Sequence, residues 1–181
     1  MKIYLASTAS SRQRSLATKL REEGHLVYDP HVQRGSIPDA DGTPPSRVFD
    51  WSLECPNHRA PSPREIRDIV RGKGAQDSFQ NDMNALVWSD VMVLEWPAAQ
   101  AMPDYLLAAG LIAAAGLVQS DVLHRRQLVA LIPRDTNVCT TWLHLFNQIC
   151  VTDDELISYL SSSMEKLEQS AKLKKQLMGD V

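Results

Sequence analysis

Strand-like and helix-like patterns of apolar residues follow one another along this chain. Residues 2–6 form a β-branched and aromatic run, and residues 91–94 form a short apolar run typical of a parallel strand covered on both faces. Between such runs the apolar residues recur at helical spacing, as Leu16 and Leu20 do in the segment 11–23. This order predicts strand–helix–strand units.

Five strand-like runs separated by helical segments predict an open α/β sheet. The runs lie at residues 2–6, 25–28, 91–94, 128–133 and 149–151. Helices are expected at residues 11–23, 62–72, 79–88, 106–117, 140–146 and from 153 onward, with a break at 74–78. Because consecutive βα units favour parallel strands, we predict a doubly wound, flavodoxin-like or Rossmann-like α/β fold. It should hold a parallel sheet of about five strands with helices on both faces.

The last helix is predicted to turn an apolar stripe toward the core. The members of this stripe are Leu156, Ile157, Leu160, Met164 and Leu167. The following segment, residues 165–175, is highly charged, and we expect it to be solvated or to contact another subunit.

Residues 30–63 break the pattern. They contain seven of the ten prolines and one aromatic island at 48–51. A loop of this length inside a compact domain is usually functional or disordered. Two interpretations stay open, an ordered flap over a pocket or a surface loop held by Trp51. With this segment included, the length predicts a single domain over residues 1–181.

Composition excludes several classes of protein. The net charge of −3 and pI near 5.9 argue against binding to a nucleic-acid polymer. Three cysteines without CxxC spacing argue against disulfides or zinc and favour a reducing, cytoplasmic setting. The five histidines lack metal-ligand spacing, so we expect no metal, and no motif indicates a dinucleotide or triphosphate cofactor. The apolar run at 106–118 is too short to span a membrane, and the first residues are too short for a signal peptide.

Three places carry candidate chemistry. The turn from Ser7 to Arg14 joins a strand to a helix N-terminus, where an anion is favoured, although Ser and Thr are also ordinary helix caps. Asp82 is either an acid, base or orienting carboxylate or part of a solvated helix face. Asp104 lies in the loop 95–104 at the carboxyl end of a strand, where open α/β sheets bind ligands. It is either a catalytic carboxylate or, as we favour, a helix N-terminal charge.

Taken together, these pieces resemble the nucleoside 2-deoxyribosyltransferases and related nucleotide N-glycoside hydrolases. The resemblance covers most of the chain. Its segments are KIYLAS at 2–7, GHLVYD at 24–29, FDW at 49–51, NDMNAL at 81–86, SDVMVL at 89–94, the helix at 110–116 and ICVTDDEL at 149–156. NDMNAL followed by SDVMVL is the most specific of them.

The resemblance implies cleavage of the bond between a base and C1′ of a ribose or deoxyribose. In this family a glutamate attacks C1′ through an oxocarbenium-like transition state, which a carboxylate stabilises. An aspartate on the preceding helix orients the sugar or assists the leaving base, and here that residue is Asp82. The implied substrate-binding residues are Tyr4, Ala6, Ser7, Ser11, Arg12, Asp50, Trp51 and Asn81.

The chain departs from the family at the nucleophile. The family glutamate lies two residues before a glycine, and that position here is Ala108, two residues before Gly110. The alanine allows three interpretations. The chain is a binding or sensing relative without catalysis, it uses a displaced carboxylate at Asp104 or Glu95, or it is a deliberate Glu→Ala variant. We therefore predict slow or absent turnover.

The predicted function is binding of a nucleoside or nucleoside 5′-monophosphate on a scaffold for N-glycosidic cleavage or base exchange. A non-catalytic nucleotide-sensing or protein-interaction module is the alternative. The expected partners are that small ligand and further copies of the chain, with no membrane.

Overall fold

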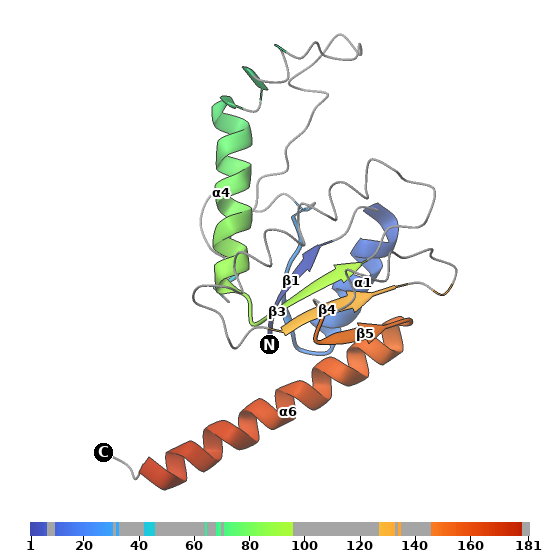
Figure 1. The fold of residues 1–181 in the computed structure, drawn as a ribbon, viewed down its shortest axis with the longest axis vertical. Helices are drawn as coiled ribbons and strands as arrows, with labels where there is room; N and C mark the ends of the chain where they lie inside the picture. The colour runs from blue at the N-terminus through green and yellow to red at the C-terminus, as the bar shows by residue number, and fades with distance from the viewer. Residues whose placement is uncertain are drawn as a thin grey trace.

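Five parallel strands form one sheet in the part of the chain that the computed structural model describes (Figure 1). The described residues are 1–6, 10–30, 32, 42–45, 64, 68–69, 71–95, 127–132, 134 and 146–178, with the backbone alone described at 10–13, 171 and 173–178. The strands are β1 (Lys2–Ala6), β2 (Leu26–Tyr28), β3 (Val91–Glu95), β4 (Gln127–Leu131) and β5 (Gln148–Cys150). Their order is β2-β1-β3-β4-β5 and each neighbouring pair is parallel. The prediction of a doubly wound α/β fold is confirmed.

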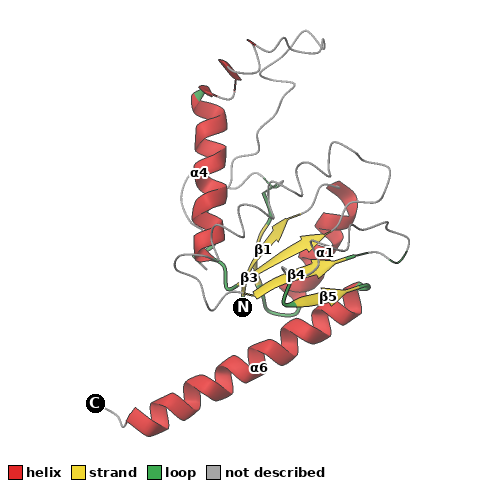
Figure 2. Ribbon diagram, in the orientation of Figure 1, coloured by secondary structure: helices red, strands yellow, loops and turns green. Residues whose placement is uncertain are grey.

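Among the described residues, three helices pack on the two faces of this sheet (Figure 2). They are α1 (Ser10–Glu22), α4 (Lys73–Trp88) and α6 (Asp153–Met178). The predicted strands and the predicted helices at 11–23, 79–88 and 153 onward are therefore confirmed to within a few residues. The predicted flap at 30–63 and the helices at 62–72, 106–117 and 140–146 fall wholly or mostly outside the described residues.

The predicted break at 74–78 is wrong, because α4 runs without interruption from Lys73. Glycine and serine are turn-formers, but here local contacts support the first turns of the helix. The Lys73 ammonium contacts both carboxylate oxygens of Asp77, four residues along, at 2.9 and 3.0 Å. The Gln76 side chain also donates a hydrogen bond to the Arg71 carbonyl at 2.9 Å.

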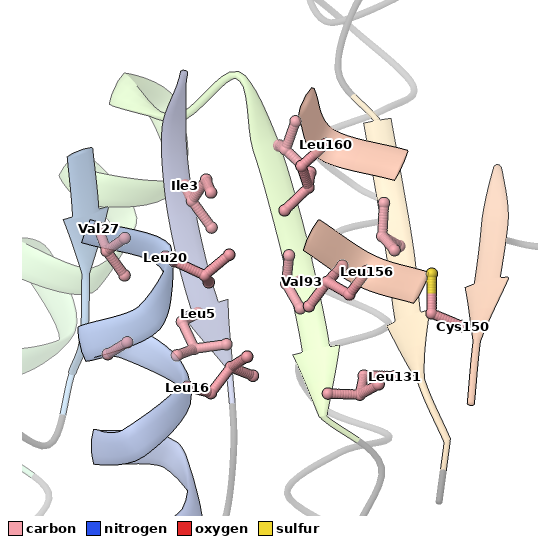
Figure 3. Packing of buried hydrophobic residues seen from close by; sticks show 13 residues of the cluster. Ile3, Leu5, Leu16, Leu20, Val27, Val93, Leu131, Cys150, Leu156 and Leu160 are labelled. Carbon is pink, nitrogen blue, oxygen red and sulfur yellow. The ribbon is translucent and has the colours of Figure 1, made fainter. Parts of the chain in front are cut away.

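One face of the sheet is closed by α1 and α6 (Figure 3). Alternate residues of β1, Ile3 and Leu5, point to this face and pack with residues of both helices. The fully buried helix residues in this cluster are Leu16, Leu20, Leu156 and Leu160. Cys150 lies in the same cluster, and burial raises the pKa of its thiol to about 11, so the thiol stays protonated at neutral pH.

The N-terminus of α6 is capped by its own sequence. The Thr152 hydroxyl accepts a hydrogen bond from the Glu155 N–H at 3.2 Å, and the Glu155 carboxylate accepts one from the Val151 N–H at 2.7 Å. This is a variation on the capping box. The Lys19 ammonium, on α1, adds an ion pair with Asp153 at 2.9 Å. These contacts fix where α6 begins.

The C-terminal part of α6 corrects one prediction. Leu156 and Leu160 are fully buried as expected, whereas Leu167 is 54% exposed. Residues 165–170 are all exposed, so the expectation of a charged, solvated segment holds there. The reason is length: the helix continues past the part that packs on the sheet.

The other face of the sheet packs against α4. The alternate residues of β1, Tyr4 and Ala6, turn to this face and meet Ala85 and Leu86 of the helix. Met92 and Leu94 of β3 belong to the same cluster. The buried residues on the two faces therefore differ, because Tyr4 and Tyr28 are buried on the α4 face.

Candidate functional site

Two stacked tyrosines and a carboxylate come together where β1, β2 and α4 meet. Tyr4 and Tyr28 lie opposite one another in the register of the parallel strands. Their ring centroids are 5.4 Å apart with an interplanar angle of 20°, a stacked arrangement. The Tyr28 hydroxyl donates a hydrogen bond to Asp82 Oδ1 at 2.8 Å. Asp82 therefore lies against the sheet and is not on a fully solvated face of the helix.

The helix holds Asp82 in this position through its apolar neighbours. Ala85 and Leu86 follow on the next turn of α4 and are buried against the sheet. Residues three and four apart lie on one face of a helix, so Asp82 is directed to the same side as those two. It is half-buried, which leaves part of the residue accessible to solvent.

Negative charge surrounds the buried Tyr4 hydroxyl. Burial raises the pKa of Tyr4 far above its ordinary value, and the charges of Asp82 and then Asp29 raise it further. The phenol therefore remains protonated throughout the physiological range and is available as a neutral hydrogen-bond donor. Asp29, which immediately follows β2, is fully buried. Two carboxylates thus lie close enough to this hydroxyl to influence it.

The position of this cluster matches the place where open α/β sheets bind ligands. The strand order reverses at β1, whose two neighbours are β2 and β3. Ligands of doubly wound folds bind outside the carboxyl ends of strands next to such a point. Tyr28 is the last residue of β2, and Asp29 follows at its carboxyl end.

Glu95 ends β3 at the same edge but on the opposite side of the sheet. Val91 and Val93 belong to the face covered by α1 and α6, and strand alternation places Glu95 with them. The residue is 4% exposed. Of the two carboxylates considered as displaced nucleophiles, Glu95 therefore points away from the face that holds Asp82.

Of the remaining predicted site residues, some are described with their side chains, some by their backbone alone, and some lie outside the described residues. Ala6 ends β1 and is buried, and Asn81 is half-buried on α4 beside Asp82. The backbone of Ser11 and Arg12 lies in the first turn of α1. Outside the described residues lie Ser7, Asp50, Trp51, Asp104 and Ala108.

Tyr28 and Asp29 were missed as site residues by sequence reasoning. The sequence does carry a signal, because both lie at the end of a strand in a fold whose ligands bind at strand ends. The aromatic ring and the carboxylate there were interpreted only as strand and turn. What the sequence does not indicate is the contact of Tyr28 with a residue 54 positions later.

No cluster of three or more histidine, cysteine, aspartate or glutamate residues suited to a metal occurs among the described residues. Within the same part of the chain, every helix is too short or too polar to cross a membrane.

Replacing Tyr28 with phenylalanine is expected to lower the free energy of unfolding by about 1.5–3 kcal/mol, the range for a hydrogen bond to a charged group. The ring and its stacking on Tyr4 would be retained, whereas the hydroxyl and its bond to Asp82 would be lost. Chemical denaturation of the parent and the variant measures the difference. The double variant with Asp82→Asn should cost less than the sum of the two single changes, and simple additivity would contradict the contact.

No protein-family model and no curated protein matches this chain. Among solved structures it is similar to a 2-deoxyribosyltransferase from the psychrotolerant bacterium Bacillus psychrosaccharolyticus. The sequence identity is 15%, the TM-score is 0.48, and the match covers 87% of this chain and 90% of that chain. That protein is described as a biocatalyst for the synthesis of antiviral and antitumoral nucleosides. At this identity and score the likeness assigns neither a residue nor an activity.

Proposed function

We propose that this chain binds a nucleoside or nucleoside 5′-monophosphate at the carboxyl edge of the sheet, beside Asp82. The observation that carries the proposal is the hydrogen bond from Tyr28 to Asp82, which holds a half-buried carboxylate next to the point where strand order reverses. The bond uses Oδ1 and fixes the orientation of the carboxyl group. A carboxylate held in this way can accept hydrogen bonds from sugar hydroxyls or an exocyclic amine.

The family resemblance of the sequence adds the reaction class. We infer that the scaffold is built for N-glycosidic cleavage or base exchange, with Ala108 where a nucleophilic carboxylate would stand. Asp82 then has the role of orienting the sugar or assisting departure of the base, and Tyr4 and Tyr28 support it from beneath. The first turn of α1 follows β1 closely, and the N-terminus of a helix favours an anion such as a 5′-phosphate.

A purely binding or sensing role is the second candidate, favoured by the alanine at 108. An alanine side chain supplies neither a nucleophile nor a proton, so a chain with this residue can retain binding and lack turnover. The two candidates share the same ligand and differ only in whether the base is released. Binding and base release must therefore be measured separately.

A ligand panel with two matched variants tests the proposal. The common nucleosides and their 5′-monophosphates are each added to the full chain, and the melting temperature is recorded. A ligand at a hundred times its Kd stabilises by about 2.7 kcal/mol, which for this chain length is roughly 5–10 °C. We expect at least one member of the panel to reach this shift.

In the same experiment Asp82→Asn should weaken that ligand roughly 10–100-fold, because a hydrogen bond to a charged group is lost. Asp77→Asn is the control, since Asp77 lies on the same helix and its carboxylate forms an ion pair with the exposed Lys73. It should leave the affinity unchanged. A flat panel would favour a protein-interaction module, and equal weakening by both variants would remove Asp82 from the site.

A further inference from the structure

The turn between α1 and β2 places a histidine where an apolar side chain is usual. Gly24 has a φ of +82°, and its N–H donates a hydrogen bond to the Arg21 carbonyl at 2.9 Å. The His25 N–H donates one to the Leu20 carbonyl at 3.1 Å. These two bonds form a Schellman motif, in which the residue after the glycine commonly packs an apolar side chain on the last turns of the helix. His25 holds that position and is 3% exposed.

The backbone around His25 is tied to the edge of the sheet at which the strands begin, called here the amino edge. The Leu26 N–H donates a hydrogen bond to the Met1 carbonyl at 2.9 Å. This bond lies where β1 and β2 start to pair, since Lys2 and Leu26 are opposite one another in the register. The backbone that carries the imidazole is therefore held between the end of α1 and the amino edge.

The imidazole of His25 is poorly placed to take up a proton. Its Nδ1 atom lies 3.4 Å from the Met1 ammonium, and it accepts a hydrogen bond from that group only in the tautomer that carries its proton on Nε2. Among the described residues, the buried Nε2 atom has no hydrogen-bond partner. A further proton would occupy Nδ1 and face the ammonium directly.

The charges that act on the imidazole come from two elements. Burial lowers the pKa of His25 and the Met1 ammonium, at the start of β1, lowers it further, whereas the Glu23 carboxylate, just after α1, raises it. Helix α6 brings an uncharged group to the same place, because the Met164 sulfur lies 3.8 Å from the Met1 ammonium. Burial and the nearest charge therefore both disfavour the imidazolium form.

We propose that His25 is a pH-sensitive switch that keeps the amino edge of the sheet closed while it is neutral and opens this edge when it is protonated. The elements joined there are α1, β1, β2 and α6. The candidate site lies at the opposite, carboxyl edge, so the switch is independent of the proposed function.

The direction of the pH effect follows from the two states of the chain. Above about pH 6.5, the ordinary pKa of histidine, both the folded and the unfolded chain hold this residue neutral, and it leaves stability unchanged. Below that pH the opened or unfolded chain takes up the proton more readily than the closed chain. Stability should therefore fall with falling pH, by up to about tenfold in the folding equilibrium constant per pH unit.

Chemical denaturation from about pH 8 to about pH 5 tests the proposal on the full chain, produced without residues before Met1. His25→Gln and His25→Leu carry no titrating group and should lose less stability than the parent toward acid pH. Their folding equilibrium constants should gain on the parent by up to about tenfold per pH unit below about 6.5. Equal pH dependence in the parent and both variants would overturn the proposal.

An NMR titration of the imidazoles in the parent chain gives a second test that needs no variant to fold. The midpoint for His25 should lie below about 6.5, and a midpoint at or above this value would contradict the proposal. Glu23→Gln should move the midpoint lower still, because the carboxylate that favours the imidazolium is removed. Glu22→Gln, the same change at a neighbouring exposed residue, should move it less, and an equal or larger shift would contradict the described position of Glu23.

Hydrogen exchange locates the opening. In the parent, the protection of the His25 and Leu26 amides, corrected for their intrinsic rates, should fall between about pH 7 and about pH 5. In His25→Leu the same fall should be smaller. Protection of these two amides that stays constant in the parent would show that the amino edge does not open.

Discussion

Leu156→Ala is expected to lower the free energy of unfolding by about 2–5 kcal/mol, the range measured when a buried leucine is truncated to alanine. Leu156 is fully buried between α6 and the sheet, in the cluster that contains Leu131 and Cys150. Truncation removes apolar contacts and leaves a cavity that a close-packed core fills only partly. For a chain of this length the melting temperature should fall by roughly 4–20 °C.

The matched control for this change lies on the same helix. Leu167→Ala removes the same atoms from a side chain that is 54% exposed, so the expected effect is within about 0.5 kcal/mol. Chemical denaturation measures the free energy of unfolding of both variants. Similar losses for the two variants would mean that α6 does not pack on the sheet as described.

Ala108→Glu is expected to raise the rate of base release at least about 100-fold, a small part of the ~10⁶-fold that loss of a serine nucleophile costs a protease. The physical reason is that a carboxylate beside C1′ stabilises the oxocarbenium-like transition state and then captures it. Residue 108 lies outside the described residues, so this expectation rests on the sequence register with Gly110. Release of free base from the ligand found in the binding panel is the measurement.

Ala109→Glu is the control, because it introduces the same charge about 100° further around the predicted helix. It should leave base release at the parent's rate. Rapid and equal turnover by the parent and Ala108→Glu would show that another group of the chain performs the attack. No turnover in Ala108→Glu, with ligand binding retained, would favour the sensing role.

Much of the fold was predictable because its signals are local. Strands buried on both faces read as short apolar runs, and α1 carries Leu16 and Leu20 at helical spacing. The errors occurred where local signals conflict with the actual contacts. Gly74 and Ser78 indicate a turn, yet both lie inside the continuous helix α4, whose first turn carries the Lys73–Asp77 ion pair. Leu167 fits the apolar stripe of α6, but periodicity alone does not reveal where the sheet ends.

The candidate site was predictable only in part, since its key contact joins distant segments. The sequence around Asp82 indicates a candidate site residue, but it is equally consistent with a carboxylate on a solvated helix face. The Tyr28 hydroxyl at 2.8 Å and the stacked Tyr4 decide its surroundings. Both tyrosines lie on strands that are far from α4 in the sequence, and Tyr28 is 54 residues from Asp82. A single sequence does not directly reveal such a long-range contact.

Strand β1 supplies alternate side chains to both layers of the molecule. Ile3 and Leu5 pack on the α1 and α6 side, and Tyr4 packs on the α4 side, where it stacks on Tyr28. Because side chains alternate with a period of two, shifting the strand by one residue would exchange the two sets. An insertion or deletion inside β1 is therefore expected to disrupt the core and the candidate site together, because the same shift moves Leu5 and Tyr4 to the wrong faces.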